Sequence, residues 1–192
     1  MISYQTKRVI KRLGLASLLI IGVPAGGALS WAAYLRLSGN IHQVGESPVY
    51  RSAQLSVSNF ENVVQEHAIK SVLNLRGPQQ NAPWYDAERA SAERLQIIYI
   101  DLPLSANEEP DEPTLDHLIA TMRDAPKPLL IHCEGGADRS GLAAALYRRV
   151  IEGAPYEKAA AELSFRYGHF PWLTSRTGAM DRAFARRADT AR

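Results

Sequence analysis

Residues 132–141 read HCEGGADRSG and combine the residue types that a thiol-based reaction on a phosphate ester needs. Cys133 is the only cysteine, so it cannot form a disulfide within the chain. Arg139 follows six places later, at the far end of a loop that can fold back and grip two phosphate oxygens, a geometry that lysine does not reproduce. We expect Cys133 to attack phosphorus and form a phosphocysteine that water then hydrolyses.

The flanking segments predict how this loop is held. Residues 128–132 (PLLIH) form a short apolar run typical of a buried central strand, and residues 140–151 carry apolar side chains at helical spacing. A loop between the carboxyl end of a strand and the start of a helix points its N–H groups into one concavity, where the helix dipole stabilises a dianion. A thiol in the same concavity is expected to have a lowered pKa.

Each residue inside the loop receives a predicted role. Gly135 and Gly136 are expected to let the chain curl tightly, since glycine tolerates positive φ. Ser140 is placed to donate a hydrogen bond to the departing sulfur, and His132 is expected to be buried and to orient the loop. The predicted phosphate-binding backbone is that of Glu134, Gly135, Gly136 and Ala137. The Gly-x4-Gly-Lys-Ser/Thr pattern of nucleotide-binding loops is absent from the sequence.

Strand and helix patterns alternate along the chain. This alternation predicts an α/β fold with a central, mostly parallel sheet flanked by helices. The expected strands are residues 49–51, 71–75, 96–100 and 128–132, and the expected helices are residues 58–67, 83–94, 114–123, 140–151, 156–167 and 177–188.

The Cys-x5-Arg loop, preceded by His and followed by Ser-Gly, resembles that of the protein tyrosine and dual-specificity phosphatase superfamily. Three further segments are similar to its compact bacterial and fungal members: residues 50–54 (YRSAQ), 72–76 (VLNLR) and 102–104 (LPL). The resemblance covers residues 49–166. It implies that Cys133 is the nucleophile, that Arg139 binds phosphate, and that neither a metal nor a cofactor takes part.

The proton donor for the leaving group is the least specified part of the predicted site. In the superfamily an aspartate on an upstream loop usually supplies this proton. The corresponding position here falls at Asn107 or Glu108. Asp138, inside the phosphate loop, is the first alternative, followed by Glu108 and Asp101. Glu109 and Asp111 are two further candidates, unless they serve only as charges at the amino end of the next helix.

The amino-terminal region predicts export. Four cations precede an uncharged stretch, residues 13–35, whose roughly 23 residues at about 1.5 Å each would cross a bilayer core of about 30 Å. The expectation is residues 1–40 as a basic cytoplasmic tip with a single membrane anchor, or a cleaved signal peptide, followed by a phosphatase domain at residues 41–192. This places the protein in the bacterial inner membrane with its catalytic domain in the periplasm.

Charge and residue spacing limit the classes of partner that we expect this chain to bind. The net charge of +2 and scattered basic residues give no basic stripe for nucleic acid, and the histidines lack metal-ligand spacing. Residues 168–172 (GHFPW) either line the rim of the site or pack in the core. The expected substrate is a phosphorylated protein, with a phosphorylated lipid headgroup (lipid A or phosphatidylglycerol phosphate) or a non-catalytic phosphate-binding role as alternatives.

Overall fold

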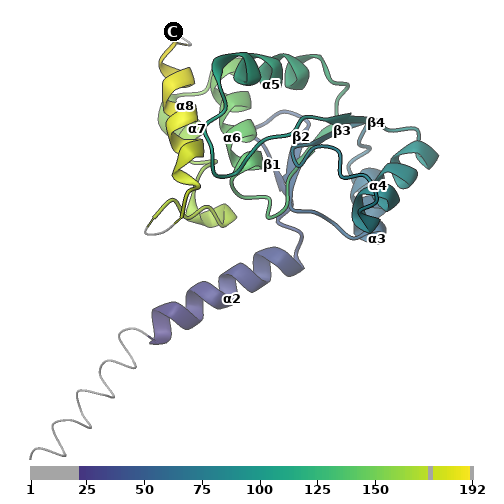
Figure 1. Ribbon diagram of the computed structural model, residues 1–192, viewed down its shortest axis with the longest axis horizontal. Coiled ribbons are helices and arrows are strands. Elements are labelled where there is room, and N and C mark those ends of the chain that lie inside the picture. Colours follow the sequence, from purple (N-terminus) through teal and green to yellow (C-terminus); the bar gives the residue numbers. More distant parts are fainter. Residues whose placement is uncertain (1–21, 173–174, 191–192) are drawn as a thin grey trace, which may run out of the picture. The chain divides into compact units, whose positions relative to one another are not determined.

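The computed structural model describes residues 22–172 and 175–190. The chain divides into two units, residues 1–37 and residues 38–192. The described part of the first unit contains helix α2, Val23–Leu37, drawn in purple in Figure 1. The second unit contains the sheet, the other described helices and the whole of residues 132–141.

Five strands form one sheet in the described second unit, in the order β1-β2-β5-β3-β4. β5 lies in the middle and pairs in parallel with β2 and β3, β3 pairs in parallel with β4, and β1 pairs antiparallel with β2. The prediction of an α/β fold with a mostly parallel sheet is confirmed. The strands are β1 His42–Gln43, β2 Val49–Ser52, β3 Ser71–Asn74, β4 Ile98–Asp101 and β5 Leu129–His132.

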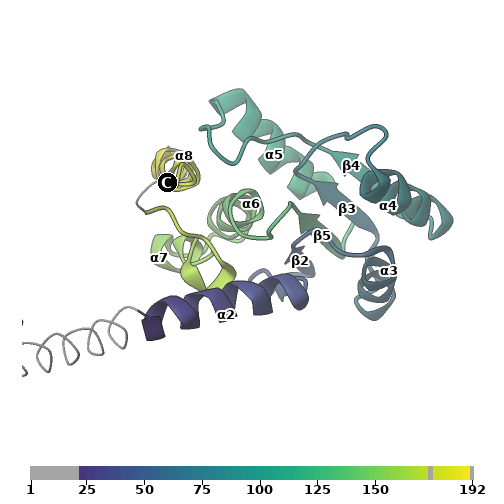
Figure 2. The ribbon, with the colours of Figure 1, turned by 60° about the horizontal axis from the view of Figure 1, so that its bottom comes forward.

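Helices cover both faces of this sheet (Figure 2). On one face lie α3 Val57–Glu66 and α4 Pro83–Arg94, and on the other lie α5 Glu112–Asp124 and α6 Arg139–Leu146. α6 continues as a π-helix, Tyr147–Ile151, and packs against α7 Tyr156–Ala160 and α8 Gly178–Thr190. A short 3-10 helix, Phe165–Tyr167, lies between α7 and α8 along the chain.

Side chains that alternate along the strands fill two hydrophobic clusters, one on each face. Leu73, Leu129 and Ile131 join the cluster with α5, α6 and α8, whereas Val72 and Leu130 join the cluster with α3 and α4. Each such fully buried side chain stabilises the fold by roughly 1.5–3 kcal/mol. Because β5 is buried on both faces, the loop that leaves its carboxyl end is held on a rigid base.

Several predicted elements differ from the structure at their ends, and one predicted helix is interrupted. β4 begins at Ile98 rather than at residue 96, because Gln96 has φ +56° where the chain turns out of α4. Residues 156–167 do not form one helix. α7 ends after Ala160, and the backbone carbonyl of Glu162 accepts a hydrogen bond from the buried Arg51 instead of one from a continuing helix.

The predicted membrane anchor is not supported. Of residues 13–35, residues 13–21 lie outside the described part of the chain, and the remainder belong to α2. The 15 residues of α2 extend over about 22 Å, less than a bilayer core of about 30 Å. Within residues 22–172 and 175–190, the structure contains no helix with the length and apolar character to cross a membrane. The predicted inner-membrane location with a periplasmic domain is therefore wrong.

Candidate active site

The loop of residues 133–138 connects the carboxyl end of β5 to the first turn of α6. Gly136 has φ +67°, and a Cβ on it would lie 2.5 Å from the backbone nitrogen of Ala53, just after β2. Gly135 has no positive φ, and a Cβ there would meet nothing within 4 Å. The expectation that both glycines use positive φ is therefore correct only for Gly136.

Cys133 lies at the base of this loop and is 2% exposed. Its Sγ is 3.4 Å from the hydroxyl oxygen of Ser140, which is fully buried in the first turn of α6. A serine hydroxyl at this position can donate a hydrogen bond to a thiolate. The structure thus brings together the two residues that the sequence assigns to nucleophilic attack and to stabilisation of the departing sulfur.

Arg139 begins α6 and turns its guanidinium toward the segment after β4. Its Nη1 donates to the carbonyl of Leu104 at 3.4 Å, and its Nη2 lies 3.8 Å from a carboxylate oxygen of Glu134. Its Nε is buried and has no hydrogen-bond partner among the described residues. Contacts this long leave most of the donors of the guanidinium available to an anion in the loop.

The carbonyl groups of the loop are bound from outside by a separate set of residues. The carbonyl of Glu134 accepts from the backbone N–H of Gln54 at 3.1 Å, and that of Gly135 accepts from the side chain of Asn40 at 3.0 Å. The carbonyls of Gly136 and Ala137 accept from the guanidinium of Arg51 at 2.9 and 3.0 Å. Within the described chain, the N–H groups of residues 134–138 donate to no protein acceptor. The loop therefore presents donors to its interior and acceptors to its exterior.

The candidate proton donors lie in different surroundings. Asp138 accepts a hydrogen bond from Nδ1 of His169 at 2.7 Å. Asp101, at the end of β4, accepts from Asn74 at 2.8 Å and from the hydroxyl of Tyr85 at 2.6 Å, so both of its oxygens are engaged. Such bonds fit a structural role for Asp101.

The segment that follows β4 holds the remaining acidic candidates. Glu109 forms ion pairs with Arg182 and Arg186 of α8, and Asp111 caps α5 by accepting from the N–H of Thr114 at 2.9 Å. Glu108 is exposed, forms no hydrogen bond or ion pair with another described residue, and lines a cavity of about 300 Å³ together with Leu104 and Ser105. Since Leu104 also contacts Arg139, this segment borders the phosphate loop.

His132 is buried at the end of β5, and its Nε2 lies 2.9 Å from a carboxylate oxygen of Glu88 on α4. Glu88 also accepts from the hydroxyl of Tyr99 at 2.6 Å and from the amide of Gln54. Burial raises the pKa of Glu88, but His132 and these donors outweigh burial and hold that pKa below its ordinary value. Glu88 thus connects α4 to the residue before the nucleophile.

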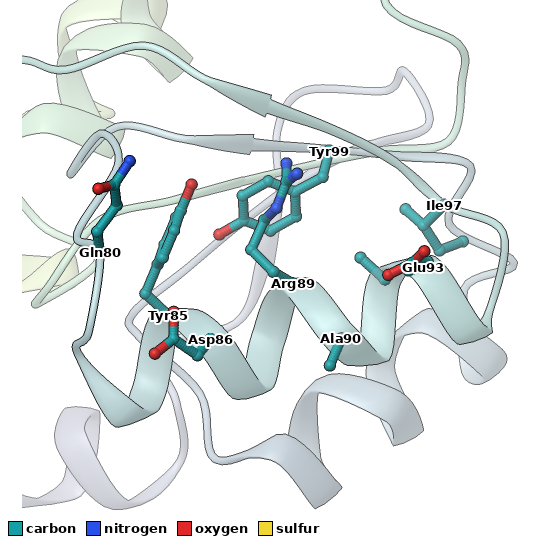
Figure 3. A pocket seen from close by; sticks show the side chains of 9 residues that line it. Gln80, Tyr85, Asp86, Arg89, Ala90, Glu93, Ile97 and Tyr99 are labelled. Carbon is teal, nitrogen blue, oxygen red and sulfur yellow. The ribbon is translucent and has the colours of Figure 1, made fainter.

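A cavity of about 750 Å³ lies beyond this network, lined by residues of α4 and β4 (Figure 3). Tyr85, Arg89 and Tyr99 line it, and the guanidinium of Arg89 lies 5.2 Å from the centre of the Tyr99 ring. None of residues 133–139 lines this cavity, so it is separate from the phosphate loop.

His169 belongs to residues 168–172, for which the sequence left open the rim of the site or the core, and its spacing from the loop carries no signal for a specific role. Its side chain is completely buried, and its two ring nitrogens contact Asp138 at 2.7 Å and Asp181 of α8 at 2.8 Å. Burial lowers the pKa of His169, but the two carboxylates outweigh burial and raise it to about 9. A protonated His169 therefore connects the phosphate loop to α8.

Comparison with known proteins agrees with this arrangement. A family model described as "DSP-PTPase phosphatase fused to NAD+ Kinase" matches residues 33–180. Dual specificity protein phosphatase TpbA of Pseudomonas aeruginosa is 30% identical to this chain over 146 residues. That alignment covers 73% of this chain and 60% of the length of TpbA.

Two solved structures share the fold. The crystal structure of P. aeruginosa TpbA in complex with pTyr has a TM-score of 0.60 and 23% identity, covering 81% of this chain and 89% of that one. The core catalytic domain of the PP-IP phosphatase SIW14 from S. cerevisiae has a TM-score of 0.59 and 20% identity, covering 79% of this chain and 91% of that one. With its family model, its α/β fold and its Cys-x5-Arg loop, the chain belongs to the dual-specificity and tyrosine phosphatase family.

Proposed function

We propose that this chain is a cysteine-dependent phosphatase that hydrolyses phosphate monoesters, with its catalytic unit in residues 41–192. The observation that carries the proposal is the arrangement of the loop, in which the carbonyls are bound from outside and the N–H groups are left for an anion around Cys133. Such a ring of donors at the start of a helix favours both a phosphate dianion and a thiolate.

The proposed reaction assigns a residue to each step. The thiolate of Cys133 attacks phosphorus in line, a sulfur–phosphorus bond forms, and the bond from phosphorus to the leaving oxygen breaks. Arg139 holds two of the phosphoryl oxygens, and the N–H groups of the loop hold the charge that spreads over them. Water then attacks the phosphocysteine, releasing phosphate and a thiolate that Ser140 stabilises by hydrogen bonding.

For the proton that the leaving oxygen takes up, Glu108 is the donor that the contacts favour, and the resulting carboxylate accepts the proton that water loses when it attacks the phosphocysteine. Asp138 is engaged with His169, and Asp101 has both oxygens in hydrogen bonds. Glu108 lies exposed beside Leu104, on the segment that contacts Arg139. This reverses the order expected from the sequence, in which Asp138 came first.

The substrate class we propose is a phosphotyrosyl protein. TpbA carries the name dual specificity protein phosphatase, and its crystal structure has been determined in complex with pTyr. Glu134 is 68% exposed next to Arg139, and its charge disfavours a polyanion such as the PP-IP substrate in the name of SIW14. The alternative of a phosphorylated lipid headgroup depended on a membrane anchor and has lost that support.

The test is hydrolysis of p-nitrophenyl phosphate by the full chain, measured beside Cys133→Ser and Arg139→Lys. A phosphatase of this type loses turnover in both variants, whereas a non-catalytic phosphate-binding module shows no thiol-dependent release at all. The second outcome would overturn the proposal. Assays on phosphotyrosyl peptides, phosphorylated lipids and inositol pyrophosphates then decide the substrate class.

A further inference from the structure

We infer that Arg51 and Asn40 are positioning residues that aim the N–H groups of the phosphate loop at the substrate. The inference rests on the proposed function, since it concerns how the same loop is held. The sequence indicates no chemical role for either residue by itself, and both are far from Cys133 along the chain. Both are buried in the folded unit.

Together the two side chains bind three consecutive carbonyls of the loop. The amide of Asn40 donates to the carbonyl of Gly135 at 3.0 Å. Nη2 of Arg51 donates to the carbonyl of Gly136 at 2.9 Å and to that of Ala137 at 3.0 Å. All of these donors lie outside the loop, on the side opposite to a bound anion.

The planarity of the peptide group turns these contacts into a constraint on the donors. In a trans peptide the C=O of one residue and the N–H of the next point in opposite directions. Fixing the carbonyls of Gly135, Gly136 and Ala137 therefore directs the N–H groups of residues 136, 137 and 138 to the interior of the loop. Donors that are preorganised in this way need no reorganisation when charge develops in the transition state.

Arg51 is itself fixed by the segment that follows α7. Its Nη1 donates to the backbone carbonyl of Glu162 at 2.7 Å and to the carboxylate of Glu162 at 3.0 Å, and its guanidinium lies 4.2 Å from the centre of the Tyr167 ring. Asn40 is tied to the same segment, because its amide also donates to the carbonyl of Tyr167 at 2.9 Å. The loop is thus held between β2 and residues 162–167.

The guanidinium of Arg51 binds two groups at once, because one terminal nitrogen donates to Glu162 and the other donates to the carbonyls of the loop. The single ammonium of a lysine keeps the charge but does not span both sets of acceptors. Burial lowers the pKa of Arg51, while Glu162, Tyr167 and Cys133 act to raise it, so the guanidinium and the nucleophile interact electrostatically. Replacing Arg51 therefore affects both the direction of the loop donors and the field at the thiol.

The experiment compares Arg51→Lys and Asn40→Ala with the unmodified full chain. For each protein, the pH dependence of Cys133 alkylation by iodoacetamide gives the pKa of the thiol, and p-nitrophenyl phosphate gives kcat and KM. We expect Arg51→Lys to lower kcat by about 100-fold, in the range seen when an oxyanion donor is lost. We also expect the thiol to titrate at higher pH and inorganic phosphate to protect it less. Asn40→Ala, which frees one carbonyl, should show smaller changes in the same directions.

Val63→Ala is the control for general loss of stability. Val63 is buried in α3, in the hydrophobic cluster on the face of the sheet away from α6, and that cluster includes none of residues 133–139. Its replacement should lower Tm and leave the thiol titration unchanged.

If Arg51→Lys and Asn40→Ala lower Tm like this control but keep the wild-type thiol titration and kcat, the positioning role is refuted. If Arg51→Lys does not fold, Asn40→Ala alone decides by the same criterion. The thiol titration is measured whether or not the wild-type chain turns over, so failure of the inference is distinguishable from failure of the proposed function.

Discussion

A Cβ atom on Gly136 would lie only 2.5 Å from the backbone nitrogen of Ala53, so the backbones of the phosphate loop and of the end of β2 are in direct contact. Gly136→Ala forces one of these backbones to move and adds a side chain at positive φ. We expect a lower Tm and a loss of phosphatase turnover, because the loop donors leave their positions. Gly135→Ala is the matched comparison for stability, since its Cβ meets no atom within 4 Å. Equal changes in Tm for the two variants, measured by thermal unfolding, would contradict this reading.

The buried His169 predicts a stability that depends on pH in the alkaline range. Its pKa is raised from 6.5 to about 9 in the folded chain, so its pairing with Asp138 and Asp181 contributes fully below about pH 6.5 and is lost as the pH rises through 9. The difference in free energy of unfolding between wild type and His169→Gln should shrink over this window, by about 3 kcal/mol. Denaturant unfolding from pH 6 to pH 10 measures it.

Asp181→Asn provides a check on the same assignment. It removes one of the two carboxylates that hold the proton on His169, so the window of pH-dependent stability should move to lower pH. A constant difference between wild type and His169→Gln across the whole pH range would show that folding does not raise the pKa of the histidine.

The identity of the proton donor is tested by substrates that differ in their need for it. An alkyl phosphate leaves as a strongly basic alkoxide, whereas p-nitrophenolate leaves readily without a proton. We expect Glu108→Gln to reduce turnover of the alkyl substrate by about 100-fold or more and that of p-nitrophenyl phosphate far less. Asp138→Asn should depress both substrates to a similar degree, because it disturbs the contact with His169. The opposite pattern would return the role to Asp138.

The contact between Ser140 and Cys133 predicts which half of the reaction depends on the hydroxyl. Without a hydrogen bond to the departing sulfur, hydrolysis of the phosphocysteine should slow by about 10-fold or more. Ser140→Ala should therefore show a burst of p-nitrophenol followed by slow turnover, which rapid-quench measurements resolve. Ser91→Ala is the control for loss of a buried hydroxyl, since Ser91 bonds to Glu61 between α3 and α4. A burst in neither variant would place the slow step before the phosphocysteine.

Local patterns were sufficient to predict much of the fold. Helix α4 has the predicted bounds, because Pro83 marks its first turn and good helix formers follow, and β5 differs from the prediction only by the loss of Pro128. The 133–139 loop could be recognised because the nucleophile, the glycines and the arginine are contiguous in the sequence.

The residues that hold the loop could not be found in this way. Asn40, Arg51 and His169 are brought to it by strand pairing and by the path of the chain after α7, and no short-range pattern records such contacts. The predicted membrane anchor is not supported for a related reason. It was predicted from apolar composition alone, whereas a bilayer span also requires an apolar helix of sufficient length, and residues 22–172 and 175–190 contain no such helix.

The support of the loop by Asn40, Arg51 and His169 has a consequence for biosynthesis. Asn40 and Arg51 come from the start of the second unit and His169 from its late part, and each contacts the loop only after the intervening chain has packed. A nascent polypeptide that ends before residue 169 therefore lacks the contact between His169 and Asp138 that joins the loop to the rest of the unit. The support of the phosphate loop is complete only at the last stage of folding, when the residues after α7 have packed against it.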